Sequence, residues 1–486
     1  MSSLNKTAKN ASIYVLLGFL APAVNLILIP IYTIELSTSD FGVITIATII
    51  ISVLINLTGL GINGAFNRYY YEYLQNRSSQ LRLFSTAILT ILISGLIIGA
   101  LFWWTGQAFL SMLFSSDTLT IAIYGMAIIG TAVGLNIQML IQSLYRNDEN
   151  IRLYSFWAII FFLSAVTGIY LGVVVYKMGA YGSIAGRAWG ILFPTALFLV
   201  VYFIKYPPVW NKKKTIAMLK YGWPLVIYLM VSLAFNSVDK VILERYFGDL
   251  SVLGVYGFAT LIASVIEIFL NAINGAVNPQ VYRLLKEKES DHPQIKKLLS
   301  IVVLVLMLLL LALISVASPA ILWFIDPEYH SAINYLPLLF ISYIPRIYFT
   351  IFSIPLFYYK NTRVLPWISS ISFLAGLVFS VLFIPLFGIY GACYALFLIR
   401  FIQCLLTIFI AYRMKSVNLD VFLVKNTYTY SIIIIVCTLI ITSLQYYLAS
   451  SWIVWLYLPV ALMFCLAIWI KFRNQLVLHF RSIIKL

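Results

Sequence analysis

The sequence predicts an all-α polytopic membrane protein with about 14 transmembrane helices, in which two parallel six-helix repeats are followed by two further helices. Its composition is the first reason, because 62% of the 486 residues are hydrophobic and only 10% are charged. In soluble domains, about 45–50% of the residues are hydrophobic and about 25% are charged. The second reason is a duplicated stretch whose copies begin at residues 47 and 259. The third is the distribution of lysine and arginine among the loops.

Fourteen apolar segments cover most of the chain, and each is long enough to cross a bilayer as a helix of about 20 residues. They span residues 11–34, 42–65, 84–104, 119–144, 153–176, 181–204, 220–246, 251–278, 298–325, 331–358, 365–386, 389–412, 427–448 and 452–470. The first segment is longer than the core of a signal peptide, so we expect a retained span there.

The basic residues predict the orientation of these spans. With a cytoplasmic N-terminus, 26 of the 32 Lys and Arg residues fall in cytoplasmic loops or tails, and only Lys177, Lys240 and Arg245 fall outside. This is the distribution described by the positive-inside rule. It predicts that both termini are cytoplasmic. It also assigns the net charge of +16 to contacts with membrane lipids and not to a nucleic acid.

The duplication predicts the domain organisation. Three patterns occur twice in the same order: A-T-x-I-x-S-V at 47–53 and 259–265, I-N-G-A-x-N at 62–67 and 273–278, and G-x-Y-G at 179–182 and 388–391. Segments 1–6 therefore map onto segments 7–12. Because six is an even number, both copies have the same orientation, as in transporters built from parallel repeats.

We therefore expect an N-lobe at 1–205, a cytoplasmic linker at 206–219, a C-lobe at 220–413 and an appended region at 414–486. The linker carries two prolines and three consecutive lysines. The appended region would hold helices 13 and 14 and a cytoplasmic tail.

Several short patterns resemble the multidrug/oligosaccharidyl-lipid/polysaccharide (MOP) exporter superfamily, and within it the Wzx-type flippases for O-antigen, capsule or exopolysaccharide repeat units. They are L-S-T-S-D-F-G at 36–42, Asp239-Lys240 followed by L-G-V-Y at 253–256, and the two G-x-Y-G turns. The resemblance covers residues 1–413. It implies a V-shaped pair of helix bundles around a central cavity that is open to one side at a time.

The resemblance also implies a cargo and a cellular setting. The cargo would be an undecaprenyl-diphosphate-linked oligosaccharide, moved from the cytoplasmic to the periplasmic leaflet of a bacterial inner membrane for O-antigen or lipopolysaccharide assembly. A polysaccharide polymerase or chain-length protein would be a further partner.

The sequence contains no credible catalytic constellation, phosphate-binding loop or metal-ligand spacing, which predicts a transporter without enzyme activity or cofactor. No soluble stretch is long enough for a nucleotide-binding domain. Transport would therefore be driven by an H⁺ or Na⁺ gradient, by membrane voltage, by cargo supply and removal, or by another protein.

Three arginines lie inside apolar segments, where a charge costs about 2.5–3.5 kcal/mol to insert. Arg346 directly follows Pro345, whose kink can line a cavity, while Arg187 and Arg400 lie in the paired segments 6 and 12. We expect these arginines to line a cationic cavity, because guanidinium groups bind phosphate oxygens bidentately. The alternative is a structural ion pair, or a side chain that extends to the membrane surface.

Asp239, which precedes Lys240, and Glu267 are the carboxylates at membrane depth. Each could couple transport to a proton or cation, or could balance the charge of an arginine across the cavity. Charge balance is favoured for Asp239, because Lys240, Glu244 and Arg245 place it toward the outer end of a mixed-charge stretch, whereas both interpretations stand for Glu267. The first copy has Ile55 at the position of Glu267, so only one half carries this carboxylate.

Uncharged polar residues in the segments are expected mainly to join helices, with a few binding sugar hydroxyls. They are Asn25, Asn56, Asn63, Gln138, Gln142, Asn236, Asn271 and Asn274.

Three other functions are considered. A lipid II flippase would share the fold and the cationic cavity. An ion-coupled multidrug antiporter is disfavoured, because segment 1 offers Asn25 and no acid before Glu35 at its outer end. A membrane-bound polymerase or ligase is disfavoured because the outer loops are short.

Overall fold

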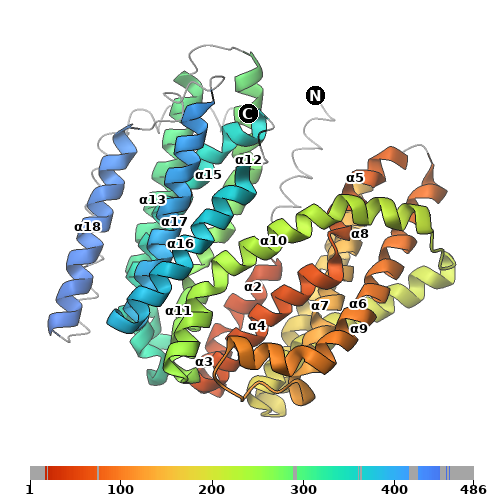
Figure 1. Cartoon of the computed structure of the whole chain (residues 1–486), viewed down its shortest axis with the longest axis horizontal. Helices are drawn as coiled ribbons and strands as arrows, with labels where there is room; N and C mark the ends of the chain where they lie inside the picture. Colours follow the sequence, from red (N-terminus) through yellow and green to blue (C-terminus); the bar gives the residue numbers. More distant parts are fainter. Residues whose placement is uncertain are drawn as a thin grey trace. The chain divides into compact units, whose positions relative to one another are not determined.

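The computed structural model describes residues 17–18, 20–73, 76–287, 293–359, 361, 364–414, 425–448, 456 and 459, and every regular element in this part is a helix (Figure 1). Within these residues, eleven helices are long and apolar enough to cross a membrane, and they correspond to predicted segments 2–12. The beginning of segment 1, most of segment 14 and both termini lie outside the described residues.

The helices group into two compact units, residues 1–258 with 369–392 and residues 259–368 with 393–486. The first unit contains α2 (Leu20–Ile27), α3 (Ile29–Glu35), α4 (Thr38–Gly59), α5 (Ile62–Tyr70), η1 (Tyr71–Tyr73), α6 (Arg77–Leu113), α7 (Ile121–Asn147), α8 (Ile151–Tyr170), η2 (Leu171–Val175), α9 (Gly179–Lys205) and α10 (Lys212–Phe247). The second contains α12 (Val265–Glu287), α13 (Pro293–Phe324), η3 (Pro327–Asn334), α14 (Leu336–Ile341), α15 (Tyr343–Tyr358) and α18 (Lys425–Leu448). Residues of α11 (Leu250–Ala263), α16 (Val364–Phe387) and α17 (Ile389–Arg413) fall in both.

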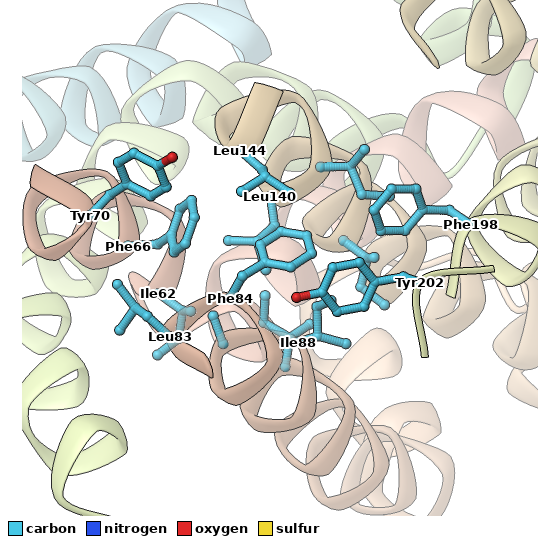
Figure 2. Packing of buried hydrophobic residues seen from close by; sticks show 14 of the residues in the cluster. Ile62, Phe66, Tyr70, Leu83, Phe84, Ile88, Leu140, Leu144, Phe198 and Tyr202 are labelled. Carbon is cyan, nitrogen blue, oxygen red and sulfur yellow. The ribbon is translucent and has the colours of Figure 1, made fainter. Parts of the chain in front are cut away.

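The core of unit 1 joins α5 to α6, α7 and α9 through large side chains (Figure 2). The ring of Phe84 on α6 lies 5.6 Å from Phe66 on α5 and 5.1 Å from Tyr202 on α9. The Tyr202 hydroxyl donates to the Leu81 carbonyl at 3.1 Å, so its polar end is satisfied inside the bundle. This packing fixes the short helix α5 on the longer ones.

The end of α4 departs from the prediction that segment 2 continues to residue 65. The helix stops at Gly59, and Leu60 (φ 46°) and Gly61 (φ 69°) take left-handed conformations before α5 begins. Gly61 lies against the backbone of Gly222 on α10, where a Cβ atom would overlap the Gly222 carbonyl. The I-N-G-A-F-N motif is therefore the start of a separate helix and not the end of the span.

One further expectation for this region is corrected. The run 67–82 between predicted segments 2 and 3 contains the end of α5, η1 and the beginning of α6, which starts at Arg77. Helix α6 has 37 residues, so it is about 55 Å long and extends past the predicted span 84–104 at both ends.

An ionic cluster holds α5 to the end of α7. Arg77 Nη2 donates to Asp148 Oδ2 at 2.7 Å, and the Tyr70 hydroxyl also donates to Asp148. Burial and the nearby carboxylate raise the pKa of Tyr70, so its hydroxyl stays protonated and remains a donor at neutral pH.

Helix α4 and the beginning of α11 approach closely within unit 1. A Cβ atom at Gly42 would overlap the Leu250 carbonyl, and one at Gly254 would overlap the Thr38 carbonyl. The two glycines are 212 positions apart, as are Thr38 and Leu250, so the close approach is reciprocal.

In unit 2, α13 packs against α12, α14, α15 and α18. The kink predicted at Pro345 is present, since α14 ends at Ile341 and α15 begins at Tyr343. A proline ring clashes with the carbonyl four residues earlier, which here belongs to Ile341. A second break, at Ser264, separates α11 from α12 and interrupts predicted segment 8.

Candidate functional site

The three predicted arginines fall into two groups that are described separately. Arg187 lies on α9 in unit 1, whereas Arg346 on α15 and Arg400 on α17 lie in unit 2. Of these three arginines, only Arg346 has a described carboxylate within ion-pair distance. The arginines therefore differ in how much of their charge is already balanced by the protein.

Arg187 lines a small, partly open pocket inside unit 1. Its walls come from α2, α7, α8 and α9, and they comprise Leu17, Leu20, Val24, Leu135, Gln138, Gln142, Ala158, Phe161, Phe162, Ala165, Arg187 and Ile191. Arg187 is the one charged residue in this lining, and Gln138 and Gln142 are the lining residues with amide side chains. An otherwise apolar wall with a few convergent polar groups is typical of a ligand pocket.

The guanidinium of Arg187 is oriented by a neutral group. Its Nη2 atom donates to Asn25 Oδ1 on α2 at 2.7 Å. An amide oxygen fixes the side chain without cancelling its charge, so the positive charge remains available to an anion.

Arg346 is paired with Glu267 in unit 2. Its Nε atom lies 3.2 Å from Glu267 Oε1, and both side chains are 30% exposed. The guanidinium also lies 5.0 Å from the centre of the Phe349 ring. The single contact through Nε leaves the two terminal nitrogens of Arg346 outside this ion pair, and partial exposure leaves the pair open to competition.

Arg400 is buried, with 6% of its surface exposed, and its neighbours are neutral. Its Nη1 atom donates to Ser342 Oγ at 2.6 Å, and its guanidinium stacks over the Tyr343 ring at 3.8 Å from the ring centre. Ser342 and Tyr343 lie at the break between α14 and α15. Both described contacts of the buried Arg400 thus come from residues at the kink next to Pro345.

Tyr343 connects the two arginines of unit 2, because it lies within electrostatic range of Arg400, Glu267 and Arg346. The sequence analysis did not select Ser342 or Tyr343. The available signal was their position just before Pro345 and Arg346 in S-Y-I-P-R at 342–346.

Asp239 and Lys240 form a separate cluster in unit 1. The Tyr256 hydroxyl donates to Asp239 Oδ2 at 2.5 Å, and Lys240 Nζ lies 3.8 Å from the same oxygen. Asp239 is fully buried, and its Oδ1 atom has no hydrogen-bond partner in the described part of the chain. Lys240 is thus the described cation within ion-pair distance of Asp239.

No group of three or more His, Cys, Asp or Glu residues that could hold a metal ion occurs within the described ranges.

Comparison with known sequences gives a consistent family assignment. The family model of polysaccharide biosynthesis proteins matches residues 7–285. The chain is 23% identical over 413 residues to Lsg locus putative protein 1 of Haemophilus influenzae, which covers 80% of this chain and 95% of that protein. It is also 23% identical over 400 residues to an uncharacterized membrane protein of the same organism, covering 79% and 94% of the two chains.

Solved structures share the fold at low sequence identity. The lipid II flippase MurJ, in an inward closed conformation, matches with a TM-score of 0.71 and 15% identity over 95% of this chain and 99% of its own. An inward-facing multidrug resistance MATE family transporter of the MOP superfamily matches with a TM-score of 0.66 and 10% identity, covering 81% and 94%. A MOP superfamily transporter from Pyrococcus furiosus, described as having a binding pocket of reverse polarity, matches with a TM-score of 0.53 and 13% identity, covering 84% and 95%.

Proposed function

Because this chain belongs to the polysaccharide biosynthesis protein family and has the fold of MOP superfamily transporters, we propose that it is a flippase for an undecaprenyl-diphosphate-linked oligosaccharide. It moves this cargo from the cytoplasmic to the periplasmic leaflet of the bacterial inner membrane, where the oligosaccharide enters surface polysaccharide such as O-antigen. Both termini are cytoplasmic in this proposal, and a polymerase or chain-length protein receives the product.

The observation that carries the proposal is the positive charge at membrane depth that carboxylates do not cancel. In the described residues, Arg187 and Arg400 are held by neutral groups, and Arg346 has one half-exposed contact with Glu267. Holding a cation in this way is costly unless an anion joins it during the transport cycle. A diphosphate provides several oxygens for such arginines.

In this mechanism the two parallel six-helix lobes form a V-shaped pair that exposes the arginines to one side at a time. Diphosphate competes with Glu267 for Arg346, so the ion pair of the empty carrier gives way to a charge-assisted contact with the cargo. Release at the other side restores the Glu267 contact. Coupling to H⁺ or Na⁺ enters through Glu267, since its charge decides how strongly Arg346 is held.

A lipid II flippase is the second candidate, favoured by the likeness to the lipid II flippase MurJ. Its cargo also carries a diphosphate, so the arginines would act in the same way. A carrier of cationic drugs is disfavoured, because the arginine side chains would repel a positively charged cargo.

The test is complementation of a bacterial strain that lacks its polysaccharide flippase but makes the matching lipid-linked repeat unit. The wild-type chain should restore surface polysaccharide. Arg346→Ala should lower it about tenfold or more, since a lost charge-assisted contact costs about 1.5–3 kcal/mol, and Arg346→Lys should recover part of the loss.

Membrane levels of each variant serve as the control. Normal polysaccharide with Arg346→Ala would remove this arginine from the mechanism. Rescue of a strain depleted of its lipid II flippase, without restoration of surface polysaccharide, would favour the second candidate.

A further inference from the structure

We propose that the Arg187 pocket of unit 1 is a subsite for a sugar phosphate, in which the guanidinium binds the phosphate and the neighbouring amides and aromatic ring bind the first sugar. This inference rests on the proposed flippase function and names the part of the cargo that unit 1 recognises. It goes beyond the arginines alone, because it assigns a role to the polar and aromatic wall around Arg187.

The phosphate position follows from the charge. Arg187 is the one cation among the lining residues, and no carboxylate is among them. Its described hydrogen bond, to Asn25 Oδ1 at 2.7 Å, uses one of five N–H groups. The remaining donors can bind two phosphate oxygens in the planar arrangement that guanidinium favours.

The sugar position follows from Gln138 and Gln142. They are four residues apart on α7, so their amides are on one face of the helix, one turn apart. Both line the pocket, and neither has a protein hydrogen-bond partner among the described residues. An amide offers both a donor and an acceptor, which matches sugar hydroxyl groups.

The remaining wall suits the apolar face of a sugar ring. Phe162 of α8 lines the pocket, and Ala158 and Ala165 of the same helix keep the wall short where a larger side chain would fill it, whereas the neighbouring Phe161 is packed in the core of unit 1. The pocket is small and partly open, so it can contact one end of the cargo but cannot hold a whole lipid-linked oligosaccharide. It is therefore a subsite for one sugar phosphate unit.

The pocket described in unit 2 differs from the Arg187 pocket. It lies between α12, α13 and α15, and it is lined by apolar side chains with Asn274, Asn278 and Thr350 and by no charged residue. Arg400 is stacked on Tyr343 and bonded to Ser342 instead of facing polar side chains of a pocket. The chemistry for a phosphate joined to a sugar is thus gathered around Arg187.

The experiment measures binding to the purified full-length protein in lipid nanodiscs by saturation-transfer NMR. Three probes are compared: glucose 1-phosphate, inorganic phosphate and glucose. We expect glucose 1-phosphate to bind more tightly than phosphate, and glucose to bind weakest. Arg187→Gln should weaken the binding of glucose 1-phosphate and of phosphate about tenfold, as expected for the loss of one charged hydrogen-bond partner.

Gln142→Leu tests the sugar contacts. This substitution should weaken the binding of glucose 1-phosphate by about threefold to tenfold, as expected for the loss of one hydrogen bond, and should leave phosphate binding unchanged. Arg146→Gln removes a positive charge from the same helix outside the pocket and is the matched control. Arg187→Lys keeps the charge without the planar fork, so it should retain weak phosphate binding, and it replaces Arg187→Gln if that variant unfolds.

Unchanged glucose 1-phosphate binding in both Arg187 variants would overturn the proposal. Equal binding of phosphate and glucose 1-phosphate would overturn the sugar part of it. The flippase function is read separately by complementation: a chain that binds through Arg187 but restores no polysaccharide refutes the function and not the pocket. A chain that restores polysaccharide with unchanged binding in the Arg187 variants refutes the pocket alone.

Discussion

In the first copy of the duplicated stretch, α4 runs through Ser52 without a break, whereas in the second copy α11 ends at Ala263 and α12 begins at Val265. The equivalent serines act differently. Ser52 Oγ donates to the Thr48 carbonyl at 2.8 Å within a continuous helix, while Ser264 lies in the turn and its Oγ donates to the Leu261 carbonyl at 2.6 Å. The same residue type therefore accompanies an intact helix in one copy and a break in the other.

About nine residues later, the helix of the first copy breaks and the helix of the second copy continues. The first copy breaks at Leu60 and Gly61, and the second continues as α12 through Ala272, the residue that aligns with Gly61. The one-residue slip between the copies lies in this part of the alignment. The extra residue of the first copy is thus accommodated by two residues with positive φ.

These differences determine where the charges of the two copies lie. The break at Ser264 puts Glu267 in the first turn of α12, where the helix N-terminus favours a negative charge, and the side chain reaches Arg346. The equivalent Ile55 lies inside α4 and carries no charge. At this aligned position, the second copy thus has a carboxylate paired with Arg346, and the first copy has an uncharged isoleucine.

The largest expected effect comes from the break in the first copy. Gly61→Ala should destabilise the protein by about 3 kcal/mol or more, because alanine is strained at this positive φ and its Cβ would overlap the Gly222 backbone. The matched control is Gly275→Ala in α12, where a Cβ meets nothing within 4 Å. That change should be neutral or stabilise by up to about 1 kcal/mol.

The measurement is unfolding by denaturant in mixed micelles, with helicity as the signal. Equal effects of the two substitutions would mean that the break at Gly61 carries no structural constraint, and the contrast between the copies would lose its energetic basis.

The second effect concerns a polar centre of unit 1 whose counterpart has fewer polar contacts in the described part of unit 2. Asn136 is buried on α7, and its Nδ2 atom donates to the Ile55 carbonyl at 2.9 Å and to Thr58 Oγ1 at 3.0 Å. Asn63 Nδ2 donates to Asn136 Oδ1 at 3.1 Å. Asn136→Ala should cost about 2–3 kcal/mol, because it leaves several of these buried groups without partners.

Thr350 is the counterpart of Asn136, by the shift of 214 positions that relates L-Y-R-N at 144–147 to Y-Y-K-N at 358–361. Its Oγ1 donates only to the Arg346 carbonyl of its own helix among the described contacts. Thr350→Val should therefore change stability by less than about 0.5 kcal/mol. A loss as large as that of Asn136→Ala would mean that the halves are equally constrained by polar contacts.

The helices themselves are largely predictable from sequence, whereas their breaks and the partners of the charges are not. Segments 2–12 are apolar over a spanning length, and composition alone decides such segments. The turn at Ser264 leaves no such signal, because A-T-x-I-x-S-V is helical throughout in the first copy. The contacts of Arg400 with Ser342 and Tyr343 join residues nearly sixty positions apart, so only packing brings them together.

The smallest expected effect is the coupling between Glu267 and Arg346. Both side chains are 30% exposed, so a double-mutant cycle with Glu267→Gln and Arg346→Gln should give about 0.5–1 kcal/mol, as for other partly solvated ion pairs. The two substitutions should then have similar, small effects on the stability of the empty protein but different effects on transport. Glu267→Gln should hardly change stability, but it frees Arg346 for the diphosphate and should change the transport rate, whereas Arg346→Gln should abolish most transport. A coupling of several kcal/mol would instead identify a rigid structural pair, and the charge that distinguishes unit 2 would then belong to folding and not to cargo exchange.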